Sequence, residues 1–156
     1  MNRVEAAVGA TMASVAGVNE ALSAYVNSVG KNAPKAVDYV ASKAIVDISK
    51  NTPVDTGRLR AGWFKSFDLL GLSRPGVRGK NVNPIEVAKG AIEGSAQRDE
   101  FVNRYSVTMR NGVRYAPFVE AGSSPQKPYG FVRPVLDRIS DDLLEAAKRI
   151  QTEGTK

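Results

Sequence analysis

Residues 52–63 read Thr52-Pro53-Val54-Asp55-Thr56-Gly57-Arg58-Leu59-Arg60-Ala61-Gly62-Trp63. This stretch begins where a helical pattern ends, because Pro53 disfavours helical geometry at the residue before it. Asp55 can accept backbone N–H groups in a turn, and Gly57 can adopt a positive φ. Turn chemistry alone explains these residue types, so we interpret the stretch as the connection between a helix and the element that follows.

The segment before this connection predicts a helix from Asn32 to about Thr52. Asn32 can cap its start and Pro34 suits its first turn, while Lys50 complements the dipole at its end. Its apolar face follows helical spacing and consists of Val37, Val40, Ala41, Ala44, Ile45 and Ile48.

A weaker helix is predicted over residues 3–29. Its seam alternates four- and three-residue steps, although Gly9 and Gly17 each oppose a helix by about 1 kcal/mol. The seam residues are Val4, Val8, Thr11, Val15, Val18, Leu22 and Tyr25. We treat residues 1–31 as a separate helical segment that becomes ordered on assembly.

After the connection, residues 59–67 predict a strand. Arg58 and Arg60 would then share one side of it, where two guanidinium groups suit a carboxylate or a phosphate; an exposed strand face is the simpler alternative. Trp63, the only tryptophan, is expected in the core, with an interface anchor as the alternative.

Residues 68–82 contain Gly71, Pro75, Gly76 and Gly79 and predict a long loop, mobile until it is bound. Between Arg58 and Lys80 there are six basic residues against Asp68 alone. The basic loop candidates could meet DNA phosphates, an acidic protein surface or only solvent; they are Lys65, Arg74, Arg78 and Lys80.

The second half of the chain alternates short elements. Asn83-Pro84-Ile85-Glu86 predicts a helix start, with the helix running to about Gly94, and residues 103–110 predict a strand. Asn111-Gly112 is a turn signal. Residues 113–119 could pair back as a hairpin, but Pro117 favours a short strand followed by a helical turn that carries Tyr115, Phe118 and Val119 and ends at Gly122.

The chain is expected to close with a Pro/Gly loop over residues 123–130, a last helix and a tail. That helix starts near Pro134 with the stripe Leu136, Ile139, Leu143, Ala147 and Ile150. We therefore predict an α+β domain over residues 32–150, with a small antiparallel sheet packed against long N-terminal and C-terminal helices, and a flexible tail over residues 151–156.

Composition limits the chemistry of the protein. The 156 residues include no cysteine, so a thiol nucleophile and cysteine metal ligands are excluded. They also include no histidine, which is the commonest general base and metal ligand. Glu120 has no second acid near it in the sequence, so we expect a salt bridge to Arg58, Arg60 or Arg114, within the chain or across a subunit boundary. We predict no catalytic residue, no cofactor and no metal, and no secretory signal or membrane anchor.

A second motif completes the pattern: Asn111-Gly112-Val113-Arg114-Tyr115-Ala116-Pro117-Phe118-Val119-Glu120-Ala121-Gly122. With Thr52 to Arg60 and the later Gly130-Phe131-Val132-Arg133-Pro134, it resembles the small head–tail connector and tail-completion (neck) proteins of tailed bacteriophages. The resemblance covers roughly residues 34–150, and the first motif is its more specific part.

The resemblance implies an α+β subunit of the virion without enzymatic activity. Such a subunit would be made in the bacterial cytoplasm and would assemble into a ring, expected to be hexameric, at the head–tail junction. Its partners would be head connector or adaptor proteins and the tail tube or tail terminator, with passing contact to genomic DNA. The motif and interface candidates are Pro53, Asp55, Thr56, Gly57, Arg58, Leu59, Arg60, Trp63, Tyr115, Phe118, Glu120 and Gly122.

Two other functions compete with this interpretation. The net charge of +6 and the basic stretch are compatible with a DNA-binding protein, although aromatic interleaving and recognition-helix patterns are missing from the sequence. A hydrolase that uses Asp55 or Glu120 is the weakest alternative, because neither carboxylate has a partner suited to acid–base chemistry.

Overall fold

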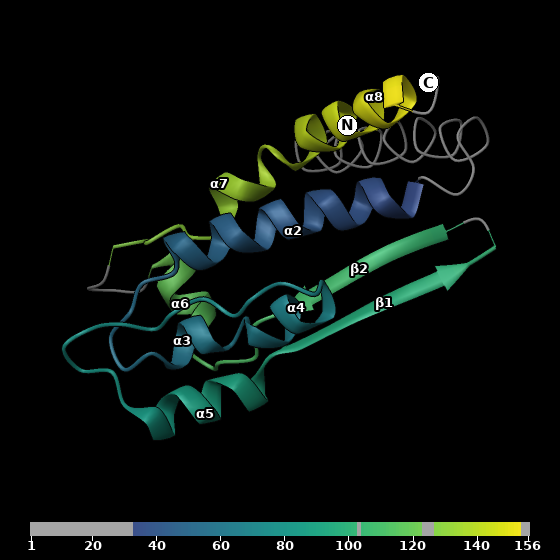
Figure 1. The fold of residues 1–156 in the computed structure, drawn as a ribbon. Helices are drawn as coiled ribbons and strands as arrows, with labels where there is room; N and C mark the ends of the chain where they lie inside the picture. The colour runs from purple at the N-terminus through teal and green to yellow at the C-terminus, as the bar shows by residue number, and fades with distance from the viewer. Residues whose placement is uncertain (1–32, 103, 123–126, 154–156) are drawn as a thin grey trace, which may run out of the picture.

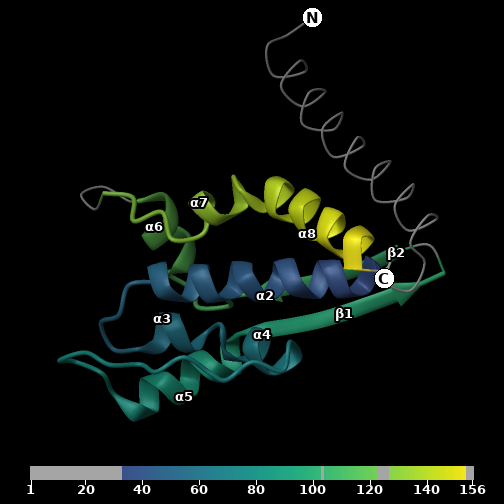
Figure 2. The ribbon, with the colours of Figure 1, turned by 45° about the horizontal axis from the view of Figure 1, so that its top comes forward.

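The computed structural model describes residues 33–102, 104–122 and 127–153. The helix predicted over residues 3–29 lies outside these ranges, as do the first part of the loop expected over 123–130 and the last three residues of the expected tail. Figures 1 and 2 show helices on both sides of a central helix, with one long hairpin running beside it.

Helix α2 (Ala33–Asn51) is the central element and matches the prediction. Its predicted apolar face is buried except for Val37, which is half-buried, and Ala33, Ala36 and Ser49 are buried with it. One side of α2 packs against α8 (Ile139–Glu153) through a small cluster of Ala36, Val40 and Ala146. Its other contacts include residues 104–110 of the hairpin and two short helices, one after Trp63 and one after Val132.

The strand predicted over residues 59–67 is wrong, because these residues form two helical pieces, α3 (Arg58–Ala61) and α4 (Phe64–Leu69). Leu59, Trp63 and Phe67 recur every four residues, and all three are in the core. That spacing places the three side chains on one helix face. A strand that turned the same three residues inward would also turn Lys65 inward and Phe64 outward, whereas Lys65 is exposed and Phe64 is buried.

The predicted loop and the helix after it are found in the structure, although the loop predicted from residue 68 starts only after Leu69, where α4 ends. Residues 72–79 form neither helix nor strand, while the mobility of this loop stays a prediction. Helix α5 (Pro84–Glu93) begins at the predicted cap, where the Asn83 side chain accepts a hydrogen bond from the Ile85 N–H at 2.9 Å, and it is followed by Gly94.

The sheet is an antiparallel hairpin of β1 (Ser95–Phe101) and β2 (Arg104–Arg110), with Ser95 opposite Arg110 and Phe101 opposite Arg104. β2 was predicted and β1 was not. The predicted turn at Asn111-Gly112 does not connect strands. Instead, the Asn111 side chain donates to the Leu59 carbonyl at 2.8 Å and accepts from the Val113 N–H at 3.2 Å.

Three helices complete the described chain. The short strand predicted before α6 (Ala116–Ala121) is absent from the described residues, but α6 itself and its end before Gly122 match the prediction. The last helix is divided into α7 (Arg133–Leu136) and α8. Leu136 was expected in the buried stripe and is 53% exposed, since Val135 points into the core instead. Helix α8 continues through Glu153, so the expected tail starts with helical residues.

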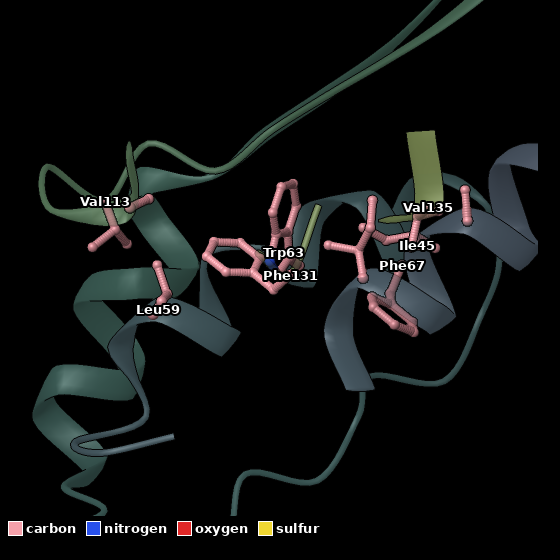
Figure 3. Close-up of a cluster of buried hydrophobic side chains, with 10 residues drawn as sticks. Ile45, Leu59, Trp63, Phe67, Val113, Phe131 and Val135 are labelled. Carbon is pink, nitrogen blue, oxygen red and sulfur yellow. The ribbon is translucent and has the colours of Figure 1, made fainter. Parts of the chain in front are cut away.

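The main core lies where α2, α3, α4 and α7 meet. Figure 3 shows Trp63 and Phe131 at its middle, with Leu59 and Val113 on one side and Ile45, Phe67 and Val135 on the other. Trp63 is 6% exposed and its indole N–H donates to the Thr52 hydroxyl at 3.1 Å. The Thr52 hydroxyl in turn donates to the Ile48 carbonyl at 2.7 Å. Trp63 is therefore a core residue, and the α+β fold class is confirmed.

Gly90 lets α5 lie directly on α3. A Cβ at Gly90 would collide with the carbonyl oxygen of Arg58. In an exposed helix, Gly→Ala stabilises by about 1 kcal/mol. Here we expect Gly90→Ala to lower the free energy of unfolding by about 1–3 kcal/mol, measured by urea denaturation.

Gly76→Ala is the matched control, because an added Cβ at Gly76 meets nothing within 4 Å. It should change the free energy of unfolding by less than about 0.5 kcal/mol. A Gly90→Ala variant as stable as the unmodified protein would contradict the close packing of α3 and α5.

Candidate functional site

The two sequence motifs, about fifty residues apart, meet at one surface pocket. The pocket has a volume of about 460 Å³ and lies beyond the C-terminal end of α2. We call it the motif pocket. Five of its residues come from the first motif, two from the second, and Glu86 and Tyr129 from elsewhere: Pro53, Asp55, Thr56, Gly57, Leu59, Glu86, Tyr115, Val119 and Tyr129.

The first motif forms one wall through its turn. Gly57 has φ 92°, as predicted from the sequence, and a Cβ there would also lie 2.6 Å from Val77 Cγ1. The turn holds the end of the long loop, because the Asn83 N–H donates to the Thr56 carbonyl at 3.0 Å and the Asn81 amide donates to the Asp55 carboxylate at 2.9 Å. Asp55 itself remains exposed.

Arg58 joins this turn to α5 through two carboxylates. Its Nε donates to Glu93 at 2.9 Å, its Nη2 donates to the other oxygen of Glu93, and its Nη1 lies 3.2 Å from Glu86. Such two-pronged pairing suits the planar guanidinium group. The hydrogen bond with Glu93 is the main cause that raises the pKa of Arg58, and it also lowers the pKa of Glu93. The pKa of Glu86 is lowered first by its hydrogen bond with Lys89 and then by Arg58.

Arg60 has a different role from Arg58. The two residues lie on a helical turn, so the prediction that they share one side of a strand is wrong. The Arg60 guanidinium group donates to the carbonyls of Thr52 at 2.8 Å and Lys50 at 3.4 Å. It therefore satisfies carbonyl groups at the end of α2, where a helix leaves acceptors without partners.

The second motif supplies the opposite wall. Tyr115 and Val119 line the motif pocket, and the Tyr129 N–H donates to the Val119 carbonyl at 2.9 Å, which brings the Tyr129 ring to the same rim. Tyr115 is 40% and Tyr129 58% exposed. Burial raises the pKa of the Tyr115 hydroxyl. Phe118 is exposed on the same helix but does not line the pocket.

Glu120 binds backbone groups within the chain instead of the predicted arginines. Its carboxylate accepts from the N–H groups of Phe131 at 2.7 Å, Val132 at 3.0 Å and Arg133 at 2.9 Å. Gly122, with φ 80°, ends α6 just after it. Glu120 thereby fixes α6 to the segment that carries the buried Phe131.

The basic loop candidates do not form one uniform group. Lys65 lies on α4 and is exposed, whereas Arg74 pairs with Asp68 at 2.6 Å and stands 5.2 Å from the Phe64 ring centre. Arg78 and Lys80 are exposed in the loop itself.

Within residues 33–102, 104–122 and 127–153, no three acidic residues are grouped so as to hold a metal ion. None of the helices in these ranges has the length and apolar character needed to cross a membrane. Asp55 and Glu86 are the carboxylates of the motif pocket, and their neighbours are amide, guanidinium and ammonium groups.

Sequence reasoning missed Glu86, Glu93 and Tyr129. The two glutamates are seven residues apart on a predicted helix, a spacing that places them on one face, and this signal could have linked them to an arginine. Tyr129 follows a proline in a loop, and no local pattern in the sequence marks its position beside the second motif.

The Arg58 network predicts a specific acid sensitivity. Because the folded-state pKa values of Glu86 and Glu93 are lowered, their stabilisation is present above the unfolded-state value near 4.5 and is lost as the pH falls through the lower folded-state values. Arg58→Gln should reduce stability at pH 7 and flatten this acid-side decline, measured by urea unfolding across a pH series.

Arg149→Gln is the control for that experiment, because it removes an ion pair with Glu145 whose partners are both more than half exposed and contribute little. It should leave the pH profile close to that of the unmodified protein. Equal profiles for Arg58→Gln and Arg149→Gln would show that the Arg58 network does not govern the acid response.

Replacement of Glu120 should loosen the second motif. Glu120→Ala leaves three N–H groups without their acceptor and should lower the free energy of unfolding by about 2–4 kcal/mol, while Glu120→Gln keeps one carbonyl oxygen and should lie between. Hydrogen exchange at the Phe131 and Val132 amides should accelerate in parallel. Glu100→Ala, at an exposed site on β1, should change neither measurement; unchanged exchange in Glu120→Ala would exclude the capping role.

Comparison with known proteins places the chain among phage proteins. Residues 16–122 match the HK97-gp10-like family model, whose description is "Bacteriophage HK97-gp10, putative tail-component". No curated protein and no solved structure matches the chain. The matched range contains both motifs and every motif-pocket residue except Tyr129. Since the match spans more than half of the 156 residues, the chain belongs to the HK97-gp10-like family of phage tail components.

Proposed function

We propose that this protein is a structural subunit of the phage virion that assembles into a homo-oligomeric ring at the head–tail junction. The family membership supports a structural role in the tail. The ring and its position at the head–tail junction go beyond the family membership and are our proposal. The ring would join head connector or adaptor proteins to the tail tube or tail terminator. We assign it no catalytic reaction.

The observation that carries the proposal is the exposure of large apolar side chains on several separate elements. Val102 is 99% exposed beside the hairpin turn, Ile92 is 75% exposed on α5, and Phe118 is 59% exposed on α6. Single exposed apolar residues are ordinary on a monomer. Their occurrence on three separate elements is more typical of a subunit that is covered on more than one side.

The test is the mass of the purified protein by light scattering, alone and mixed with tail tubes. We expect a discrete species near six times the 16.7 kDa chain, either in solution or only on the tubes. A protein that stays monomeric under both conditions would contradict the proposal.

Salt-dependent binding to duplex DNA distinguishes the alternative function. The exposed Lys65, Arg78 and Lys80 are the residues that would carry it. A DNA-binding protein that engages six or more phosphates would lose about three decades of affinity between low and moderate salt. We expect negligible duplex binding at about 50 mM salt; strong binding with that steep dependence would favour the alternative.

A further inference from the structure

The far end of the hairpin and the motif pocket lie at opposite ends of α2. Arg98 and Tyr105, on the two strands, both contact Asp38 near the start of α2, at 3.0 Å and 2.7 Å. The strands continue past these contacts, and both ribbon views show them extending beyond the beginning of α2 (Figures 1 and 2). The motif pocket begins at Pro53, just after α2 ends.

The far end of the hairpin presents an apolar surface with a positive charge beside it. Phe101 is 64% and Val102 99% exposed. The Arg104 guanidinium carbon stands 5.9 Å from the centre of the Phe101 ring, and the two residues are register partners. The cation–π contact restricts the Phe101 and Arg104 side chains, and such restriction lowers the entropy cost of docking. We call Phe101, Val102 and Arg104 the arm tip.

The motif pocket has the complementary chemistry. Pro53, Leu59 and the two tyrosines give it apolar walls, and its volume of about 460 Å³ lies in the range of cavities that take a bulky side chain or ligand. Its carboxylates are Asp55 and Glu86. Glu86 already pairs with Arg58 and Lys89, whereas the exposed Asp55 accepts only from the Asn81 amide among the contacts that the structure describes.

An arm tip cannot reach the motif pocket of its own chain. The 19 residues of α2 separate the two features by roughly 28 Å at 1.5 Å per residue, and Asp38 holds the hairpin along the helix. An arm tip that occupies the pocket must therefore come from another molecule. The same chain supplies an apolar, cationic tip and an apolar, acidic pocket, so a second copy fits without any further partner.

We propose that the arm tip of one copy docks in the motif pocket of the next, with Phe101 and Val102 against the tyrosines and Arg104 facing Asp55. This inference rests on the proposed self-assembly and identifies its contact. Because tip and pocket are different surfaces, the contact is heterologous, and its repetition closes into a ring if the rotation between copies allows it.

Cross-linking tests the contact directly, since the chain has no cysteine of its own. Val102→Cys protein mixed with Tyr129→Cys protein should form a disulfide-linked dimer under oxidation. The double variant should form a ladder of multiples that ends at the mass of the assembled ring. Val102→Cys mixed with Ile92→Cys is the matched control, because Ile92 is more exposed than Tyr129 but lies outside the motif pocket, and this mixture should give no such dimer.

Charge reversal tests the pairing of Arg104 with Asp55. Arg104→Glu and Asp55→Arg should each weaken assembly by about tenfold or more, and the double variant should recover most of the loss. Val102→Asp should also block assembly, and at 99% exposure it leaves folding unaffected. Lys65→Glu, at an exposed site outside the contact, should have no effect.

The outcomes separate this inference from the proposed function. A monomer under all conditions, with and without tail tubes, overturns both. A ring that survives Val102→Asp and gives no Val102–Tyr129 cross-link overturns the contact and leaves the ring standing. A Val102→Asp variant that still forms rings but no longer binds tail tubes assigns the arm tip to the tube instead, and also overturns the contact.

Discussion

The attachment of α3 to α5 is the constraint on which the motif pocket depends. Arg58 holds Glu86 and Glu93 from one side, and Gly90 allows the α5 backbone to touch the Arg58 carbonyl from the other. Arg58 of the first motif therefore makes its ion pairs inside the subunit. Glu86 belongs both to this attachment and to the pocket lining, so any shift of α5 would change the shape of the pocket.

The core connects the first motif to the second. Trp63 follows α3, and its indole N–H binds Thr52 at the end of α2, so the two ends of the first motif are fixed together. Phe131 packs in the same core, and its N–H is bound by Glu120 of α6. The pocket walls therefore belong to one continuous packed unit, which is what a preformed docking surface requires.

The sequence correctly predicted the elements whose signals lie within their own residues. It failed to predict the elements whose conformation depends on tertiary packing. Helix α2 and helix α5 have caps, prolines and an apolar face within their own residues. The strand predicted over residues 59–67 failed because Leu59, Trp63 and Phe67 share one face in a strand as well as in a helix. Only the packing shows that Phe64 is buried with them and that Lys65 is exposed. Strand β1 was missed because its residues, Ser-Ala-Gln-Arg-Asp-Glu-Phe, are almost all polar and lie on an exposed hairpin. The two motifs were recognised as important, but their meeting at one pocket depends on contacts over fifty residues apart.

The distribution of charge separates assembly from nucleic-acid binding more clearly than the net value does. Six basic residues lie between Arg58 and Lys80, yet Arg58 and Arg60 bind groups of their own subunit and Arg74 pairs with Asp68. Half of the basic residues that suggested phosphate binding are therefore paired within the subunit. The exposed apolar residues have no comparable internal use: Val102 contributes nothing to the core at 99% exposure. The internal pairing of these arginines and the exposure of Phe101 and Val102 favour the proposed contact with protein over the DNA-binding alternative.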